Sequence, residues 1–220
     1  APGGNYIVGL DATSGEEAWR FYAIARPGER GGNSWNGLPL EQRNGASVWV
    51  AGTYDPTLNL AFFGPAQTYD TGPLRNLVNG PGITNDGLYT DSTVAINPDT
   101  GRVVWHFQHQ PNDQWDLDWA FERQIVKLTV DGVTKPVVVT GGKQGIFDTL
   151  DAETGKYAFS IDMGLQNIVT AINPKTGAKA IDPRLVPGDG EAKMVCPHAA
   201  GGRSWIPTSY SPDTNVLFVP

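Results

Sequence analysis

The sequence predicts an all-β protein in which short hairpins follow one another along the chain, as they do in a β-propeller. The first observation is a turn motif that begins with Asx and ends with Ser-Gly or Thr-Gly, preceded each time by a strand-like segment. The second is the aromatic residue that follows three of these turns. The third is the composition, since 27 glycines and 17 prolines favour many turns between short strands over long helices.

The turn motif has an Asx side chain that can accept hydrogen bonds from the backbone ahead of it, and a glycine suited to a positive φ angle. The clear copies are residues 10–15, 96–101, 150–155 and 172–177, with weaker copies at 54–57 and 210–214. Each copy predicts a β-hairpin. We favour a propeller because radial repetition lets the long inserts between copies emerge on one face. A β-sandwich with coincidental turns is the alternative.

The rest of the chain agrees with an all-β protein. No segment keeps a 3.6-residue periodicity over a dozen positions, and residues 120–129 alternate more like a strand than like a helix. The net charge of −7 argues against a nucleic-acid-binding or anionic-membrane surface. No apolar run approaches the roughly 18 residues of a membrane-spanning helix. The lone cysteine, Cys196, cannot form an internal disulfide.

The most informative stretch is residues 112–119, which hold three aspartates and two tryptophans. In an extended strand Asp116 and Asp118 would share one face, and large apolar side chains would occupy the other. Carboxylate oxygens held in this way suit a hard metal ion or a proton acceptor. The alternative interpretation is a polar turn between strands with two tryptophans in the core.

Together, the hairpins and this acidic stretch resemble the quinoprotein alcohol dehydrogenases, which carry pyrroloquinoline quinone (PQQ) in an eight-bladed β-propeller. The resemblance runs over nearly the whole chain. It implies that residues 1–220 form a single partial propeller domain of several blades, with blades missing before and after it. We therefore expect the chain to be a piece of a longer protein.

The first two matched motifs concern the cofactor floor and the metal. Trp49, in Gly-Ala-Ser-Val-Trp, falls where the family has the tryptophan under the quinone, and a flat indole suits a planar tricyclic partner. A blade-core tryptophan is the alternative. Gln67 falls where the family usually has an asparagine as metal ligand. It keeps the amide oxygen but adds one methylene, so it could coordinate the metal or only hydrogen-bond beside it.

The next two motifs concern catalysis. The resemblance places Asp116 at the catalytic base, which also contacts the metal, and Asp118 at the extra carboxylate ligand of lanthanide-dependent members. An extra negative ligand suits a trivalent ion, although the same spacing occurs in relatives that look calcium-dependent. Lys143, in Thr-Gly-Gly-Lys-Gln-Gly, falls where the family has a basic residue that contacts the quinone and the base. A surface lysine on a glycine-rich hairpin is the alternative.

The last match is weaker. In residues 196–205, Ser204 stands where many members have an asparagine that bonds the cofactor, followed by Trp205. Both are candidate cofactor contacts, and Arg203 and Trp205 are expected at the entrance. Two family features are absent from this sequence: the upstream metal-binding glutamate and the vicinal disulfide over the quinone.

The resemblance implies oxidation of a small alcohol by hydride transfer to PQQ, held with Ca²⁺ or a lanthanide ion, and electron transfer to a cytochrome c in the periplasm. The resemblance does not decide whether the protein forms a homo-oligomer. Two alternatives remain: a quinoprotein sugar or aldose dehydrogenase, and a non-catalytic propeller scaffold. Substrate choice would depend on the long inserts at 26–43 and 69–91, which look like loops over the site.

Overall fold

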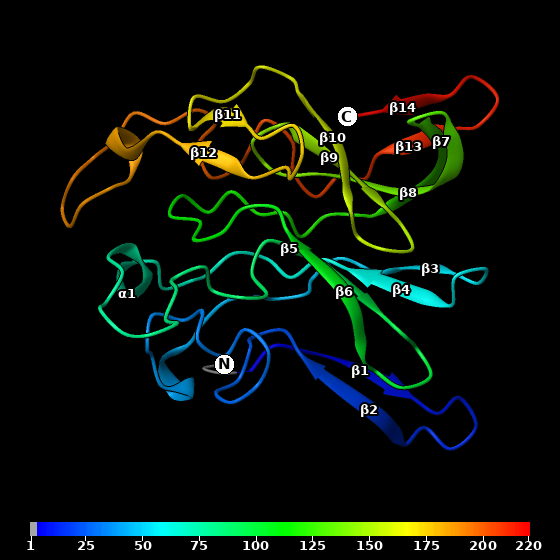
Figure 1. Cartoon of the computed structure of the whole chain (residues 1–220), viewed down its shortest axis with the longest axis horizontal. Helices are drawn as coiled ribbons and strands as arrows, with labels where there is room; N and C mark the ends of the chain where they lie inside the picture. The colour runs from blue at the N-terminus through cyan, green and yellow to red at the C-terminus, as the bar shows by residue number, and fades with distance from the viewer. Residues whose placement is uncertain (1–3) are drawn as a thin grey trace.

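The computed structural model describes residues 4–220, and short antiparallel strands account for most of its regular structure (Figure 1). The first hairpin pairs β1 (Tyr6–Leu10) with β2 (Glu17–Tyr22). Two four-stranded sheets follow it. Their strands are β3 (Thr53–Asp55), β4 (Leu60–Phe63), β5 (Ser92–Ile96) and β6 (Val103–Gln108), then β7 (Gln124–Val130), β8 (Val133–Gly141), β9 (Ile146–Asp151) and β10 (Tyr157–Asp162). The last two hairpins are β11 (Val169–Ile172) with β12 (Lys179–Ile181), and β13 (Ser209–Ser211) with β14 (Val216–Phe218).

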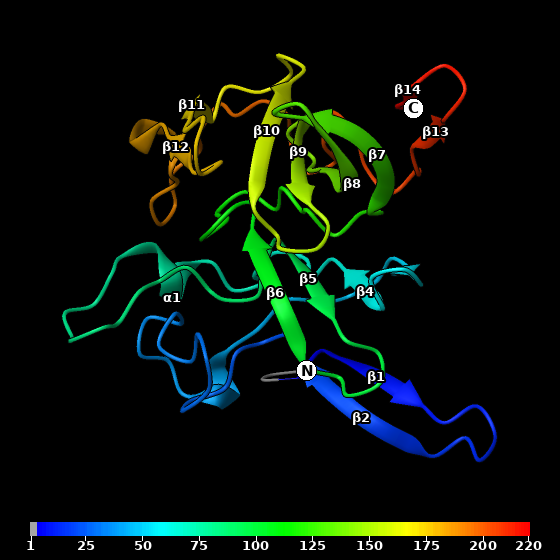
Figure 2. The same cartoon turned by 45° about the vertical axis from the view of Figure 1, so that its right-hand side comes forward.

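Both four-stranded sheets are simple meanders, in which each strand pairs with the next one along the chain. In Figures 1 and 2 the chain passes from the β1–β2 hairpin, through the β3–β6 sheet, to the β7–β10 sheet. This succession of meanders is the repetition that the sequence predicts. Helical structure in the described part is limited to α1 (Gly72–Arg75) and two three-residue 3₁₀ segments, η1 (Leu40–Gln42) and η2 (Pro183–Leu185). No helix in residues 4–220 is long and apolar enough to cross a membrane.

All six predicted turns join consecutive antiparallel strands, so the hairpin predictions are confirmed. The turn after β9 shows the mechanism. The Asp151 carboxylate accepts hydrogen bonds from the backbone N–H groups of Glu153 and Thr154, at 3.1 and 2.9 Å. Gly155 then takes a φ of +70°, which costs a glycine little. The turn thus forms from interactions within five residues of sequence.

The aromatic residue that follows three of the turns connects one hairpin to the next. Trp105 of β6 lies against Gly155, where an added Cβ would come within 2.5 Å of the indole ring. Its Nε1 donates to the carbonyl oxygen of Ala152, 3.1 Å away. Trp19 of β2 makes the same contact with Gly101 and donates to the carbonyl of Pro98. The repeated glycine therefore serves two purposes: it allows the positive φ angle, and it leaves room for the preceding aromatic ring.

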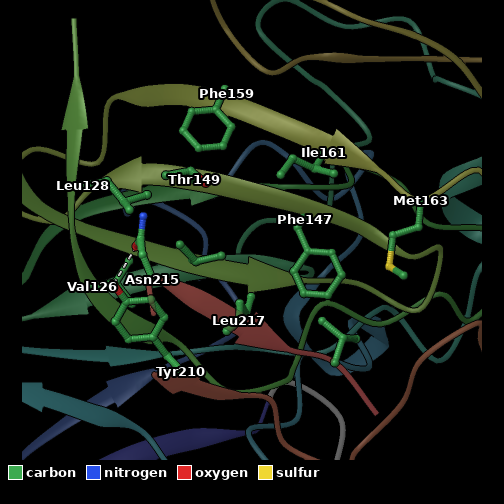
Figure 3. Close-up of a pocket in the computed structure, with 12 residues that line it drawn as sticks. Val126, Leu128, Phe147, Thr149, Phe159, Ile161, Met163, Tyr210, Asn215 and Leu217 are labelled. Atoms are coloured by element: carbon green, nitrogen blue, oxygen red, sulfur yellow. Dashed lines mark hydrogen bonds between the residues drawn. The ribbon is translucent and has the colours of Figure 1, made fainter. Parts of the chain in front are cut away.

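An apolar groove of about 340 Å³ lies where the β13–β14 hairpin packs against the β7–β10 sheet (Figure 3). Phe147, Phe159 and Leu217 are among the side chains that point into it. The polar groups of Tyr210 and Asn215 are hydrogen-bonded to each other at 2.8 Å. The groove contains no acid, base or cation to perform chemistry, so we interpret it as a packing space between strands.

We predict that Gly155→Ala destabilises the protein by about 2–5 kcal/mol, since the alanine must adopt a positive φ and displace the Trp105 ring. The matched control is Gly132→Ala. Gly132 has a φ of +78° and nothing within 4 Å of an added Cβ, so only the backbone cost of about 1 kcal/mol applies. Denaturant unfolding of both variants measures the difference. Equal losses would mean that the aromatic contact contributes nothing.

Candidate active site

A buried lysine brings the two aspartates of the acidic stretch together. The Lys143 ammonium lies 3.1 Å from Asp116 Oδ1 and 2.7 Å from Asp118 Oδ2. It also donates to the backbone carbonyl of Asp116 at 2.9 Å. Lys143 is only 8% exposed and follows the end of β8. The interpretation of Lys143 as a surface lysine is therefore wrong.

Residues 112–119 form a loop, so the prediction of an extended strand here is also wrong. Asp113 organises the loop by accepting hydrogen bonds from the backbone N–H groups of Trp115 and Leu117, at 2.8 and 2.5 Å. Asp116 has a φ of +63°, a left-handed conformation that aspartate tolerates better than most residues. The two carboxylates converge because of this bend and because Lys143 lies between them. The predicted strand at 120–129 begins only at Gln124.

Gln67 completes the cluster from the loop after β4. Its backbone N–H donates to Asp118 Oδ1 at 3.2 Å, and its side-chain Nε2 donates to Asp116 Oδ1 at 2.7 Å. Its Oε1 is buried without a hydrogen-bond partner. A buried amide oxygen without a partner is costly, so this atom points to a missing ligand.

The donor set fits a hard cation. Two carboxylates and one amide oxygen are the ligands that Ca²⁺ and similar ions prefer. Within residues 4–220 no three His, Cys, Asp or Glu side chains are grouped to hold a metal ion by themselves. Gln67, Asp116 and Asp118 would therefore hold the ion together with at least one ligand from outside this set.

Burial controls the protonation of this cluster. It raises the pKa of Asp113 to about 7, although the two backbone hydrogen bonds oppose the rise. It also raises the pKa of Asp118, with the Lys143 ion pair acting in the opposite direction. For Lys143 itself, burial is the largest influence and disfavours the charge, but the hydrogen bonds and charges of Asp118 and Asp116 together outweigh burial and raise the pKa. Lys143 is therefore a fixed positive charge beside a group of acids.

Trp119 attaches the 112–119 loop to the rest of the molecule. The sequence predicts for this residue only that its ring packs in the core. Its ring is fully buried and stacks on His109, with centroids 4.4 Å apart and planes 3° from parallel. Its Nε1 donates to Gln144 Oε1 at 2.9 Å, beside Lys143. Its backbone N–H donates to Asp91 Oδ1 at 2.9 Å. Trp119, the residue after Asp118, is thus held by three separate contacts.

His109 is itself held by a buried network from three sheets. Its Nδ1 lies 2.7 Å from Asp148 Oδ2, which also pairs with the Lys179 ammonium at 2.6 Å. Its Nε2 lies 2.8 Å from the hydroxyl of Thr93, which also accepts a hydrogen bond from Arg123. This arrangement favours the neutral tautomer with the proton on Nδ1. No sequence spacing connects these residues, so the network could not be predicted from a motif.

The other candidate residues make no hydrogen bond or ion pair with the acids of the cluster in the described part of the chain, although the backbone N–H of Gly202, close to Ser204, donates to the carbonyl of Lys143 at 2.8 Å. Trp49 is 46% exposed, and its ring is perpendicular to that of Phe121, with centroids 5.7 Å apart. No hydrogen bond or ion pair joins Ser204 or Trp205 to the cluster within residues 4–220, and Trp205 is 68% exposed. Arg203, which is expected at the entrance, is buried and pairs with Glu122 at 2.9 Å.

Comparison with known proteins assigns the fold and the family. Residues 2–165 match the family model described as "PQQ: Glucose/ethanol/alcohol dehydrogenase, beta-propeller domain". The predicted β-propeller is thus confirmed, and the chain belongs to this PQQ dehydrogenase family.

Several curated proteins resemble the chain over 98% of its length. They include the quinohemoprotein alcohol dehydrogenase ADH-IIG of Pseudomonas putida, at 32% identity, and the dehydrogenase subunit of alcohol dehydrogenase (quinone) from Gluconobacter oxydans (strain 621H), at 29%. Lupanine 17-hydroxylase [cytochrome c] of a Pseudomonas species is 28% identical. The chain covers 31%, 30% and 32% of these proteins, or about a third of their length.

Solved structures of quinoprotein dehydrogenases also resemble the chain in fold. The quinohemoprotein alcohol dehydrogenase ADHIIG from Pseudomonas putida HK5 superposes with a TM-score of 0.85 at 32% identity, over 98% of this chain and 33% of that one. A europium-containing methanol dehydrogenase superposes with a TM-score of 0.82 over 96% of this chain and 39% of that one. Its 24% identity supports the fold alone.

We predict that His109 makes the folded protein sensitive to acid. Burial, outweighing the Asp148 contact, lowers its pKa from 6.5 to about 4. Between these values the unfolded chain binds a proton that the folded protein does not, so the free energy of unfolding falls as the pH falls. From roughly pH 7 to pH 5 wild type should lose about 2 kcal/mol more than His109→Gln, as measured by denaturant unfolding at both pH values. Parallel pH profiles would contradict this.

Proposed function

We propose that the chain is part of a PQQ-dependent alcohol dehydrogenase, and that residues 1–220 contribute several blades and much of the catalytic site. The observation that carries the proposal is the meeting of Asp116, Asp118, Gln67 and Lys143, residues that lie up to 76 positions apart in sequence (143 − 67). A propeller scaffold would not need a buried cluster of acids around a lysine, because burying charges is costly.

The exposure of the two aspartates supports different roles for them. The side chain of Asp116 is 49% exposed, whereas that of Asp118 is 7% exposed. Asp116 can therefore reach a substrate hydroxyl and accept its proton, for which about 3 Å between the oxygens is needed. Asp118 is placed as a ligand or a fixed charge. Lys143 holds Asp116 in orientation and keeps a positive charge beside the reacting atoms.

The cofactors supply the oxidising step. When bound, PQQ would supply the acceptor for the hydride of the alcohol carbon, and the cation would supply a Lewis acid beside the quinone. Gln67 Oε1, Asp116 and Asp118 would bind the ion, which is Ca²⁺ or a lanthanide. Trp49 is 46% exposed, and its flat indole is a candidate surface on which a planar cofactor would stack. Ser204 and Trp205 remain candidates for contacts at the cofactor's rim.

The physiological setting is proposed from the relatives. A small alcohol is the substrate we favour, since two relatives are named as alcohol dehydrogenases. A cytochrome c is the electron acceptor we favour, since the name of a third includes it. We place the protein in the periplasm, as the family resemblance implies. A sugar or aldose substrate is the alternative, and the inserts at 26–43 and 69–91 would decide between them.

We predict that Asp116→Asn in the intact protein lowers kcat for a primary alcohol by about 10²–10⁴-fold, because the amide cannot accept the hydroxyl proton. Asparagine tolerates the left-handed backbone at this position, and its carbonyl can still accept the hydrogen bond from Gln67. The thermal transition and PQQ binding, followed by absorbance, should therefore stay near wild type. Wild-type turnover in this variant would refute Asp116 as the base.

The cofactor requirement is tested by reconstitution. We expect the metal-free intact protein to oxidise short primary alcohols, with a dye as acceptor, only after addition of PQQ and either Ca²⁺ or La³⁺. Activity with La³⁺ alone would support Asp118 as an additional ligand, and activity with Ca²⁺ alone would assign it a structural role. Failure to bind PQQ with either ion would favour the scaffold.

A further inference from the structure

A second buried atom without a partner lies close to the proposed ion site. Asp91 directly precedes β5 and is 0% exposed, yet its Oδ2 has no hydrogen-bond partner. Its backbone is left-handed, with a φ of +46°. Burying a carboxylate oxygen without a partner is expensive, so a group that satisfies it is expected. The Oε1 atom of Gln67 is the other such atom beside the same acids.

Asp91 links the two segments that carry the proposed ligands. Its backbone N–H donates to the carbonyl of Ala66 at 3.2 Å, one residue before Gln67. Its Oδ1 accepts the backbone N–H of Trp119 at 2.9 Å, one residue after Asp118. Asp91 is therefore bonded to the residues that adjoin two of the proposed ligands, and no motif connected it with the site.

The charges around Asp91 are unbalanced without a cation. Burial, together with the nearby carboxylates of Asp113 and Asp118, raises the pKa of Asp91 well above its usual value, against the opposing charge of Lys143. Lys143 and Arg123, whose guanidinium also interacts with the charge of Asp91, are two cations against the four carboxyl groups of Asp91, Asp113, Asp116 and Asp118. A multivalent cation would remove this imbalance.

We propose that Asp91 is a further residue of the cation site, a buried carboxyl group that supplies negative charge to an ion bound by Gln67, Asp116 and Asp118 and favours a trivalent ion over a divalent one. The inference rests on the proposed function only in so far as a cation binds there. Asp91 acts on the ion through its charge, while its Oδ1 continues to hold Trp119. The preference for a trivalent ion follows because the Coulomb attraction scales with the charge of the ion.

Asp91→Asn tests the proposal. The amide keeps an acceptor for Trp119, tolerates the left-handed backbone and is a close replacement for a neutral carboxyl group, so the cation-free variant should fold like wild type. The PQQ-loaded intact protein would be titrated with Tb³⁺, whose emission tryptophan can sensitise, and then with competing Ca²⁺. We expect Tb³⁺ affinity to fall roughly a hundred-fold and Ca²⁺ affinity to fall less, by about twenty-fold at most, because the attraction of the Asp91 charge scales with the charge of the ion.

The matched control is Asp131→Asn, which removes the same charge at another left-handed position, on the exposed turn between β7 and β8. It should leave both affinities unchanged. If Asp91→Asn fails to fold, Asp91→Ser, whose hydroxyl can accept the Trp119 bond, should show the same loss of selectivity.

The outcomes separate this inference from the proposed function. Equal losses for the two ions, or no loss for either, with normal binding in wild type, would overturn the role of Asp91 and leave the enzyme assignment standing. A wild-type protein that binds PQQ but neither cation would overturn the ion site and Asp91 with it. A wild-type protein that binds neither PQQ nor cation would overturn the proposed function as well.

Discussion

The geometry of the site depends on the packing of Trp119. Its indole stacks on His109, its Nε1 bonds Gln144, and its backbone N–H bonds Asp91. Gly142 lies so close to the ring that an added Cβ would come within 2.5 Å. The adjoining Asp118 therefore has little freedom to move relative to the loop that carries Lys143.

The buried charges and polar groups beside Trp119 are unfavourable for the stability of the fold. The buried acids around Lys143 keep raised pKa values, and two polar atoms, on Asp91 and Gln67, have no partner. In a protein selected for stability alone such groups would be replaced or paired. Functional sites commonly retain this kind of local cost, which the rest of the fold offsets. Here the offset comes from repeated sheets that are joined by aromatic contacts such as that of Trp105 with Gly155.

The hairpins of the fold and the loop of the site differ in how far they could be predicted from the sequence. All six hairpins could be predicted because the Asx hydrogen bonds and the positive-φ glycine act within a few residues. The strand expected at 112–119 was wrong because the bonds of Asp113 to Trp115 and Leu117 bend the backbone into a loop. The conclusion that Asp116 and Asp118 belong together was correct for a different reason, their shared contact with Lys143.

The sequence by itself determined the hairpin repeat and, through family resemblance, which residues to examine for chemistry. Only the tertiary structure decided how they meet. Gln67 reaches Asp116 across 49 positions, and His109 reaches Asp148 across 39. Asp91 enters the site through bonds to Ala66 and Trp119, which no spacing reveals. The physical reason is the distance along the chain over which each interaction acts. The hydrogen bonds of a turn join residues that are neighbours in sequence, whereas burial and charge pairing depend on which sheets pack together.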